Sequence, residues 1–70
     1  MKFTLIDFTG GDIEKALIDD RDDVVMSGDY YHDKINDKIE GFFEGLDYAK
    51  LKYNVEEVEQ DGSLYDSKYS

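Results

Sequence analysis

The single histidine, His32, is the first residue to test for chemistry, because carboxylates flank it at Asp29 and Asp33. A histidine paired with a carboxylate can transfer protons as a general acid or base. Catalysis of this kind also requires a nucleophile or a bound substrate. No serine or threonine has an evident relation to His32 in the sequence. We therefore expect no catalytic residue and a chain that is not an enzyme.

Two other segments have the composition of ligand-binding loops but lack residues that such loops need. Residues 9–12 (TGGD) lack the Gly-x-Gly-x-x-Gly pattern and the Walker lysine, and Asp12 would repel a phosphate. Residues 19–23 (DDRDD) lack the spacing and the closing glutamate of an EF-hand, and Arg21 stands at their centre. The chain has no cysteine for a zinc site. We expect no metal and no cofactor.

Acidic residues dominate the charge of the chain. Its 70 residues include 18 Asp+Glu against 8 Lys+Arg, which gives a net charge of -10. The excess is -4 over residues 1–28, -3 over 29–50 and -3 over 51–70, so it is not a terminal tail. Nucleic acids and anionic membranes repel such a chain, and we expect no direct binding to either. The expected partner is a basic surface of a nucleic-acid-handling protein.

The composition also indicates a folded domain. Hydrophobic residues make up 40% of the chain, and 6 Tyr and 4 Phe supply ten aromatic rings, which disordered acidic chains usually lack. Residues 1–7 (MKFTLID) have no apolar signal-peptide core. No stretch approaches the roughly 20 apolar residues of a membrane span. We expect a cytoplasmic protein.

The longest predicted element is a helix from Tyr30 to about Lys50. Its apolar residues recur at helical spacing and form one stripe: Tyr31, Ile35, Ile39, Phe42, Leu46 and Ala49. At about 100° per residue, six carboxylates fall within about 80° of one another on the opposite side: Asp29, Asp33, Asp37, Glu40, Glu44 and Asp47. Tyr30 and Tyr48 lie beside them. This acidic stripe is either an ordinary solvated face or a surface that binds a basic partner.

Two glycines, Gly41 and Gly45, interrupt the same helix. A glycine inside a helix lowers helix stability by about 1 kcal/mol relative to alanine. Two explanations can account for keeping the pair. One reason is close packing against another element of the same domain. The other is close approach by a partner or by a second copy of the chain, as in a homodimer.

Shorter elements are predicted around the long helix. Residues 2–8 indicate a strand, and the glycine pair that follows, with Thr9 and Asp12 as capping residues, favours a helix from 12 to about 20. Residues 24–26 indicate a short strand or, in an α+β arrangement, a buried loop. Residues 27–29 indicate a turn, with Asp29 as the N-cap of the long helix. Residues 52–59 indicate another strand.

The predicted fold is α/β or α+β, with a small three-stranded sheet in the order β-α-β-α-β and two helices, the second long and amphipathic. Residues 1–62 would form one domain. The Asp61-Gly62 pair is typical of a hairpin turn, so residues 63–70 would form either a fourth, edge strand or a flexible tail.

In size, acidity and lack of cysteine or catalytic motif, the chain resembles the small acidic proteins that bacteriophages encode to disable host enzymes. These include DNA mimics and anti-CRISPR proteins. The resemblance rests on overall character, carried by the acidic stripe and by residues 19–23 and 56–59. It implies a non-enzymatic inhibitor in the host cytoplasm that occupies a basic groove, for example that of a CRISPR effector nuclease. The alternative is a small structural or assembly protein that self-associates through its apolar and glycine surfaces.

Overall fold

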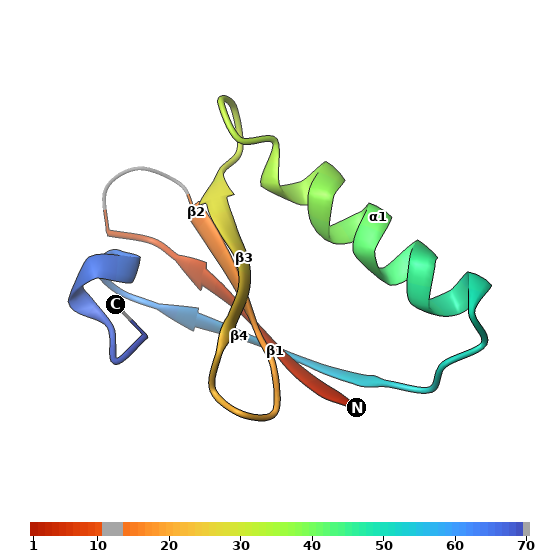
Figure 1. The fold of residues 1–70 in the computed structure, drawn as a ribbon. Coiled ribbons are helices and arrows are strands. Elements are labelled where there is room, and N and C mark those ends of the chain that lie inside the picture. Colours follow the sequence, from red (N-terminus) through yellow and green to blue (C-terminus); the bar gives the residue numbers. More distant parts are fainter. Residues whose placement is uncertain (11–13, 70) are drawn as a thin grey trace.

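The computed structural model describes residues 1–10 and 14–69. Four strands form one mixed sheet in the order β3-β2-β1-β4, in which β1–β2 and β2–β3 are antiparallel and β1–β4 are parallel (Figure 1). The elements in chain order are β1 (Lys2–Phe8), β2 (Glu14–Ile18), β3 (Val24–Asp29), α1 (Ile35–Tyr48), β4 (Asn54–Gln60) and the 3-10 helix η1 (Leu64–Asp66). The fold is therefore α+β, with a β-β-β-α-β order.

The predicted first helix is wrong, because residues 14–18 form the strand β2. Ala16, Leu17 and Ile18 are all fully buried or nearly so, which shows that both faces of this central strand are covered. The sequence of a strand that is buried on both faces is a continuous apolar run and does not alternate between apolar and polar residues. Asp12 lies outside the described residues. The Thr9 hydroxyl, predicted to cap that helix, donates to the Asp61 carboxylate instead, at 3.0 Å.

The predicted turn at residues 27–29 is also wrong, because β3 continues through Asp29. The helix α1 begins at Ile35, five residues after the predicted start. Lys34 precedes it in the left-handed region, at φ 49°. Lys50 is left-handed at the other end, at φ 59°, and the Leu51 N–H donates to the Leu46 carbonyl at 3.0 Å in a Schellman-type ending.

The sheet carries an apolar cluster on each face. The cluster beneath α1 consists of Phe3, Leu5, Leu17, Ile35 and Ile39. The cluster on the other face consists of Ile6, Phe8, Ala16 and Ile18, with Val58, Leu64 and Tyr69 packed against it. The C-terminal segment thus packs on the sheet through Leu64 and Tyr69, and it adds no edge strand.

The helix α1 covers only part of its face of the sheet. Its main contacts with the sheet are made to β3 and β2, whereas β4 contacts chiefly β1 (Figure 1). The helix-side face of β4 is consequently left open. Within residues 1–10 and 14–69, no helix has the length and apolar character needed to cross a bilayer.

Candidate functional site

An aromatic cluster fixes the rotation of α1 about its axis. The Phe3 ring of β1 makes edge contacts with the rings of Phe42 and Phe43, with centroids 5.5 Å apart in each pair. The Tyr53 ring stacks on Phe43 at 4.9 Å. Ile35 and Ile39 of the same helix are also buried, so one side of the helix is committed to the core. The opposite side must therefore face solvent.

That outer face carries four of the six carboxylates predicted for the acidic stripe. Asp37, Glu40, Glu44 and Asp47 are all exposed on α1. Asp37 and Asp47 are ten residues apart, so the row spans about 15 Å along the helix. The carboxylates of Asp37, Glu40 and Glu44 make no hydrogen bond or ion pair with any residue that the structure describes. We call these four carboxylates the helix row.

Asp47 differs from the rest of the helix row in having a partner. Its carboxylate accepts a hydrogen bond from the Tyr53 hydroxyl at 3.0 Å. Burial, and then this hydrogen bond to a carboxylate, raise the pKa of Tyr53. The bond joins the last turn of α1 to the residue before β4, so Asp47 helps to position the end of the helix.

Asp29 is the last residue of β3 and Asp33 lies in the loop before α1, so the prediction that they extend the stripe along the helix is wrong. The Asp29 carboxylate accepts the backbone N–H groups of Tyr31, His32 and Asp33, at 3.0, 2.6 and 3.1 Å. In return, the Asp33 carboxylate accepts the Asp29 N–H at 3.0 Å. The pKa of Asp29 is lowered, first by the N–H of Asp33 and then by those of His32 and Tyr31, while burial opposes the change. The two carboxylates hold the loop together.

The two predicted tyrosines have different environments. Tyr48 is 91% exposed beside the helix row and is available to a partner. Tyr30 is half-buried against the core, and its hydroxyl donates to the Asp7 carboxylate at 3.0 Å. Burial, then this hydrogen bond, raise the pKa of Tyr30. Tyr30 therefore positions the loop and is not part of the outer surface.

Sequence reasoning missed the polar group around Tyr30. The Lys15 ammonium lies 3.8 Å from the Asp7 carboxylate, donates to the Asn36 side chain at 2.9 Å and lies 5.3 Å from the Tyr30 ring centre. The sequence contained one signal of this group. Asp7 lies two and four residues after Leu5 and Phe3 in the predicted strand, so its side chain is on the same face as theirs.

No described residue forms an ion pair with a carboxylate of the helix row. The Lys15–Asp7 contact is the one ion pair between residues of the described part of the chain. The last turn of α1 contains Asp47 and no basic residue, although the negative end of the helix dipole favours a cation there. The outer face of α1 therefore presents uncompensated negative charge.

Gly41 and Gly45 do not pack against another element, so the first explanation offered for them is wrong. A Cβ built at either glycine meets nothing within 4 Å. Both glycines lie on the open part of the helix, next to the helix row. Their bare backbone leaves room for close approach from outside.

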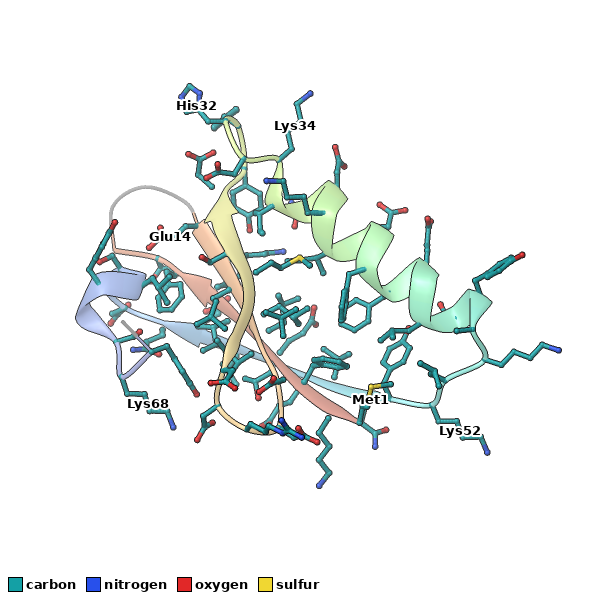
Figure 2. The ribbon with its side chains drawn as sticks, viewed as in Figure 1. Met1, Glu14, His32, Lys34, Lys52 and Lys68 are labelled. Carbon is teal, nitrogen blue, oxygen red and sulfur yellow. The ribbon has the colours of Figure 1, made fainter. Side chains whose placement is uncertain are left out.

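The remaining sequence candidates lie in loops. His32 is exposed and projects away from the sheet with Lys34, before α1 (Figure 2). Its imidazole makes no hydrogen bond with a described residue. The Asp19 carboxylate accepts the N–H groups of Arg21 and Asp23, both at 2.9 Å, and so shapes the turn before β3. Among the described residues, no group of three histidine or acidic side chains is placed to hold a metal ion.

Searches against protein families, curated proteins and solved structures find no match to this chain. The choice of a site therefore depends on charge, exposure and geometry. These favour the helix row with Tyr48, on the face of α1 turned away from the sheet.

Proposed function

We propose that this chain is a non-enzymatic acidic protein that inhibits a nucleic-acid-handling enzyme by binding its basic groove. The helix row makes the contact, and Tyr48 adds an aromatic anchor of the kind enriched at protein interfaces. The observation that carries the proposal is the exposure of carboxylates on one face of α1, where no described residue forms an ion pair with them.

The energetic cost of the helix row supports a role outside the fold. Glu40 and Glu44 are four residues apart, and like charges at this spacing destabilise a helix by a few tenths of a kcal/mol. Asp47 adds a further cost at the negative end of the helix dipole. Two exposed glycines weaken the same helix. A face selected only for stability would replace several of these residues.

The geometry of the helix row fits a groove that binds nucleic-acid backbone. Four carboxylates over about 15 Å give one charge every ~5 Å. Phosphates along one strand of a duplex repeat every ~3.4 Å. The row is thus less dense in charge than a nucleic-acid strand but long enough to contact several lysines or arginines in such a groove. Binding of this kind weakens steeply with salt.

The proposal is tested with a panel of three enzymes: a guide-loaded Cas9-type nuclease, a restriction endonuclease and a DNA glycosylase. We expect the wild-type chain to inhibit at least one of them stoichiometrically by blocking its binding to DNA. Failure to inhibit any of the three, even in large molar excess, would contradict the proposal.

Two variants with equal net charge locate the contact. The helix variant carries Asp37→Asn, Glu40→Gln and Glu44→Gln. The turn variant carries three changes in the exposed turn before β3: Asp20→Asn, Asp22→Asn and Asp23→Asn. Exposed ion pairs are worth up to about 1 kcal/mol each, so the helix variant should bind its target roughly tenfold to a hundredfold more weakly. The turn variant should lose no more than about threefold.

Self-association is a second candidate function, favoured by the open glycines. The surface around Gly41 and Gly45 admits a second helix, and Tyr48 and Leu51 lie exposed beyond it. The helix row opposes such a contact, because it would bring like charges together. Light scattering over a range of concentrations discriminates between the candidates, since self-association predicts a mass that rises above 8.1 kDa.

A further inference from the structure

The outer edge of β4 presents main-chain groups that no described residue uses. The Asn54 N–H donates to the Met1 carbonyl at 2.9 Å, and the Gln60 carbonyl accepts from the Thr9 N–H at 3.0 Å, so both residues turn their backbone toward β1. Backbone direction alternates along a strand. Val55, Glu57 and Glu59 therefore turn their N–H and C=O groups away from the sheet. This free edge is about 13 Å long.

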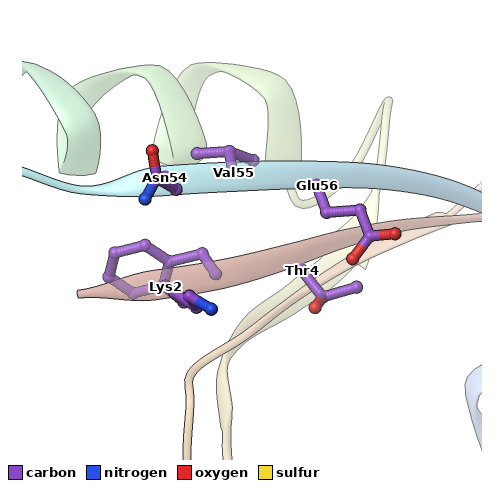
Figure 3. A pocket seen from close by; sticks show the side chains of 6 residues that line it. Lys2, Thr4, Asn54, Val55 and Glu56 are labelled. Carbon is purple, nitrogen blue, oxygen red and sulfur yellow. The ribbon is translucent and has the colours of Figure 1, made fainter.

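The side chains of the same three residues lie on the helix side of the sheet. Val55, Glu57 and Glu59 pair in register with Phe3, Leu5 and Asp7 of β1, and the first two of these β1 residues pack beneath α1. Figure 3 shows Val55 on the helix side of β4 and Glu56 on the other side, toward Thr4. Since α1 leaves this face of β4 open, both Glu57 and Glu59 are exposed. The edge thus combines unpaired backbone with two neighbouring carboxylates.

The other edge of the sheet is less suited to accept a strand. The pairing of β3 with β2 shifts between Leu17 and Ile18, and Val25 lacks a partner in this bulge. Bulges of this kind protect an edge from further pairing. In contrast, β4 pairs with β1 over seven consecutive residues without a shift. The regular strand geometry that a new strand requires is therefore found at β4.

The charge of the β4 edge selects among possible occupants. Glu56, Glu57 and Glu59 would face other carboxylates if β4 paired with a second copy of the chain, and like charges opposite one another destabilise a sheet. A lysine- or arginine-rich strand would instead place cations beside these carboxylates. Charge therefore disfavours pairing of β4 with β4 of a second copy of the chain and favours pairing with a basic peptide.

We propose that the β4 edge binds an extended basic peptide segment of a protein partner, which adds to the sheet as a fifth strand. Its backbone pairs with Val55, Glu57 and Glu59. Alternate lysines or arginines, two residues apart, lie beside Glu57 and Glu59 on the helix side. This surface is separate from the helix row, and the inference does not depend on the proposed function.

The experiment uses fluorescence anisotropy with a short labelled peptide in which lysine and threonine alternate. Two further peptides carry backbone N-methyl groups, one on every lysine and the other on every threonine, so their charge is unchanged. A strand turns alternate N–H groups toward its neighbour. We expect one methylated peptide to bind about tenfold more weakly and the other within about threefold of the parent. Equal binding of all three peptides, or no binding of the parent, would overturn the proposal.

Amide hydrogen exchange gives a second readout that charge attraction alone would not change. The N–H groups of Val55, Glu57 and Glu59 should exchange rapidly in the free chain and become protected in the peptide complex. The N–H groups of Glu56 and Val58, which point to β1, should be protected in both states. If the amides of Val55, Glu57 and Glu59 exchange equally fast with and without bound peptide, the peptide does not pair with the β4 edge and the proposal is refuted.

A variant of the protein completes the test. Val55→Pro removes an outward N–H but none of the bonds from β4 to β1, which is where edge strands tolerate proline. Val55→Thr is the matched control. We expect the proline variant to show a cooperative thermal unfolding transition, which shows that it folds. It should bind the peptide several-fold more weakly than the threonine variant. The helix variant should bind the peptide within about threefold of wild type, which separates a failure at β4 from a failure at α1.

Discussion

Replacing Gly41 and Gly45 with alanine is expected to stabilise the chain. Neither glycine has the positive φ that an alanine would resist, and a Cβ at either position meets nothing within 4 Å. The substitution therefore adds no clash. It removes the backbone freedom that a helical glycine loses on folding.

The size of the effect follows from helix propensity. Alanine is favoured over glycine by about 1 kcal/mol within a helix, so the double variant should gain about 2 kcal/mol. In a domain of this size, 1 kcal/mol shifts the melting temperature by about 4–8 °C. We expect each single variant to melt about 4–8 °C above wild type and the double variant to melt higher still.

Thermal unfolding followed by circular dichroism measures these shifts, and Gly10→Ala supplies the opposite control. A Cβ at Gly10 would collide with the backbone of Gly62, which itself has a φ of 95°. This control should therefore lower the melting temperature. A loss of stability in Gly41→Ala or Gly45→Ala would show that these positions are packed and would refute the placement of the outer face of α1.

Two further predictions concern pH. The lowered pKa of Asp29 means that its ionised form stabilises the fold fully above the usual value of 3.8, and that this contribution is lost as pH falls through the lowered pKa. Asp29→Ala should therefore melt below wild type at neutral pH, and the difference should shrink in acid; a difference that persists would contradict the role of its charge. The raised pKa values of Tyr30 and Tyr53 mean that their protonated forms add stability below the usual value of 10.0, which is lost as pH rises through the raised values. Tyr30→Phe and Tyr53→Phe should each remove a late step from the alkaline absorbance titration, and an unchanged titration would contradict the hydrogen bonds to Asp7 and Asp47.

The buried face of α1 can be predicted from the sequence because helical spacing reports burial directly. Ile35 and Ile39, predicted as part of the apolar stripe, are buried against the sheet. Tyr31 and Ala49 fit the same spacing but lie outside the helix. The helix ends where Lys34 and Lys50 adopt left-handed backbone, and lysine has no preference that marks such a position.

The strand β2 could not be predicted by the same reasoning. A run such as residues 16–18 is compatible with a buried strand or a buried helix, and periodicity does not separate the two. The preceding glycine pair and acidic residue favour a helix start by local chemistry. Pairing with β1 and β3 on both sides decides the outcome, and the periodicity within residues 14–18 does not report those contacts with other strands.

The candidate site was predicted in part. Asp37, Glu40, Glu44 and Asp47 share the outer face because helix geometry places them there. Their exposure follows from the burial of the opposite face.

Asp29 and Asp33 fit the spacing of the stripe equally well, but their carboxylates bind loop N–H groups. Whether an aspartate caps its own loop or faces a partner depends on backbone conformation, which residue spacing does not report. The β4 edge was missed because strand order within a sheet is set by tertiary contacts.

The salt dependence of target binding tests the central claim most directly. The logarithm of the affinity of wild type, helix variant and turn variant for the inhibited enzyme is measured against the logarithm of salt concentration. If the helix row makes the contact, the helix variant binds weakly with a shallower slope, while the turn variant keeps the wild-type slope. Equal slopes and equal affinities for the two variants would show that only net charge matters, and would contradict the assignment of the helix row as the binding surface.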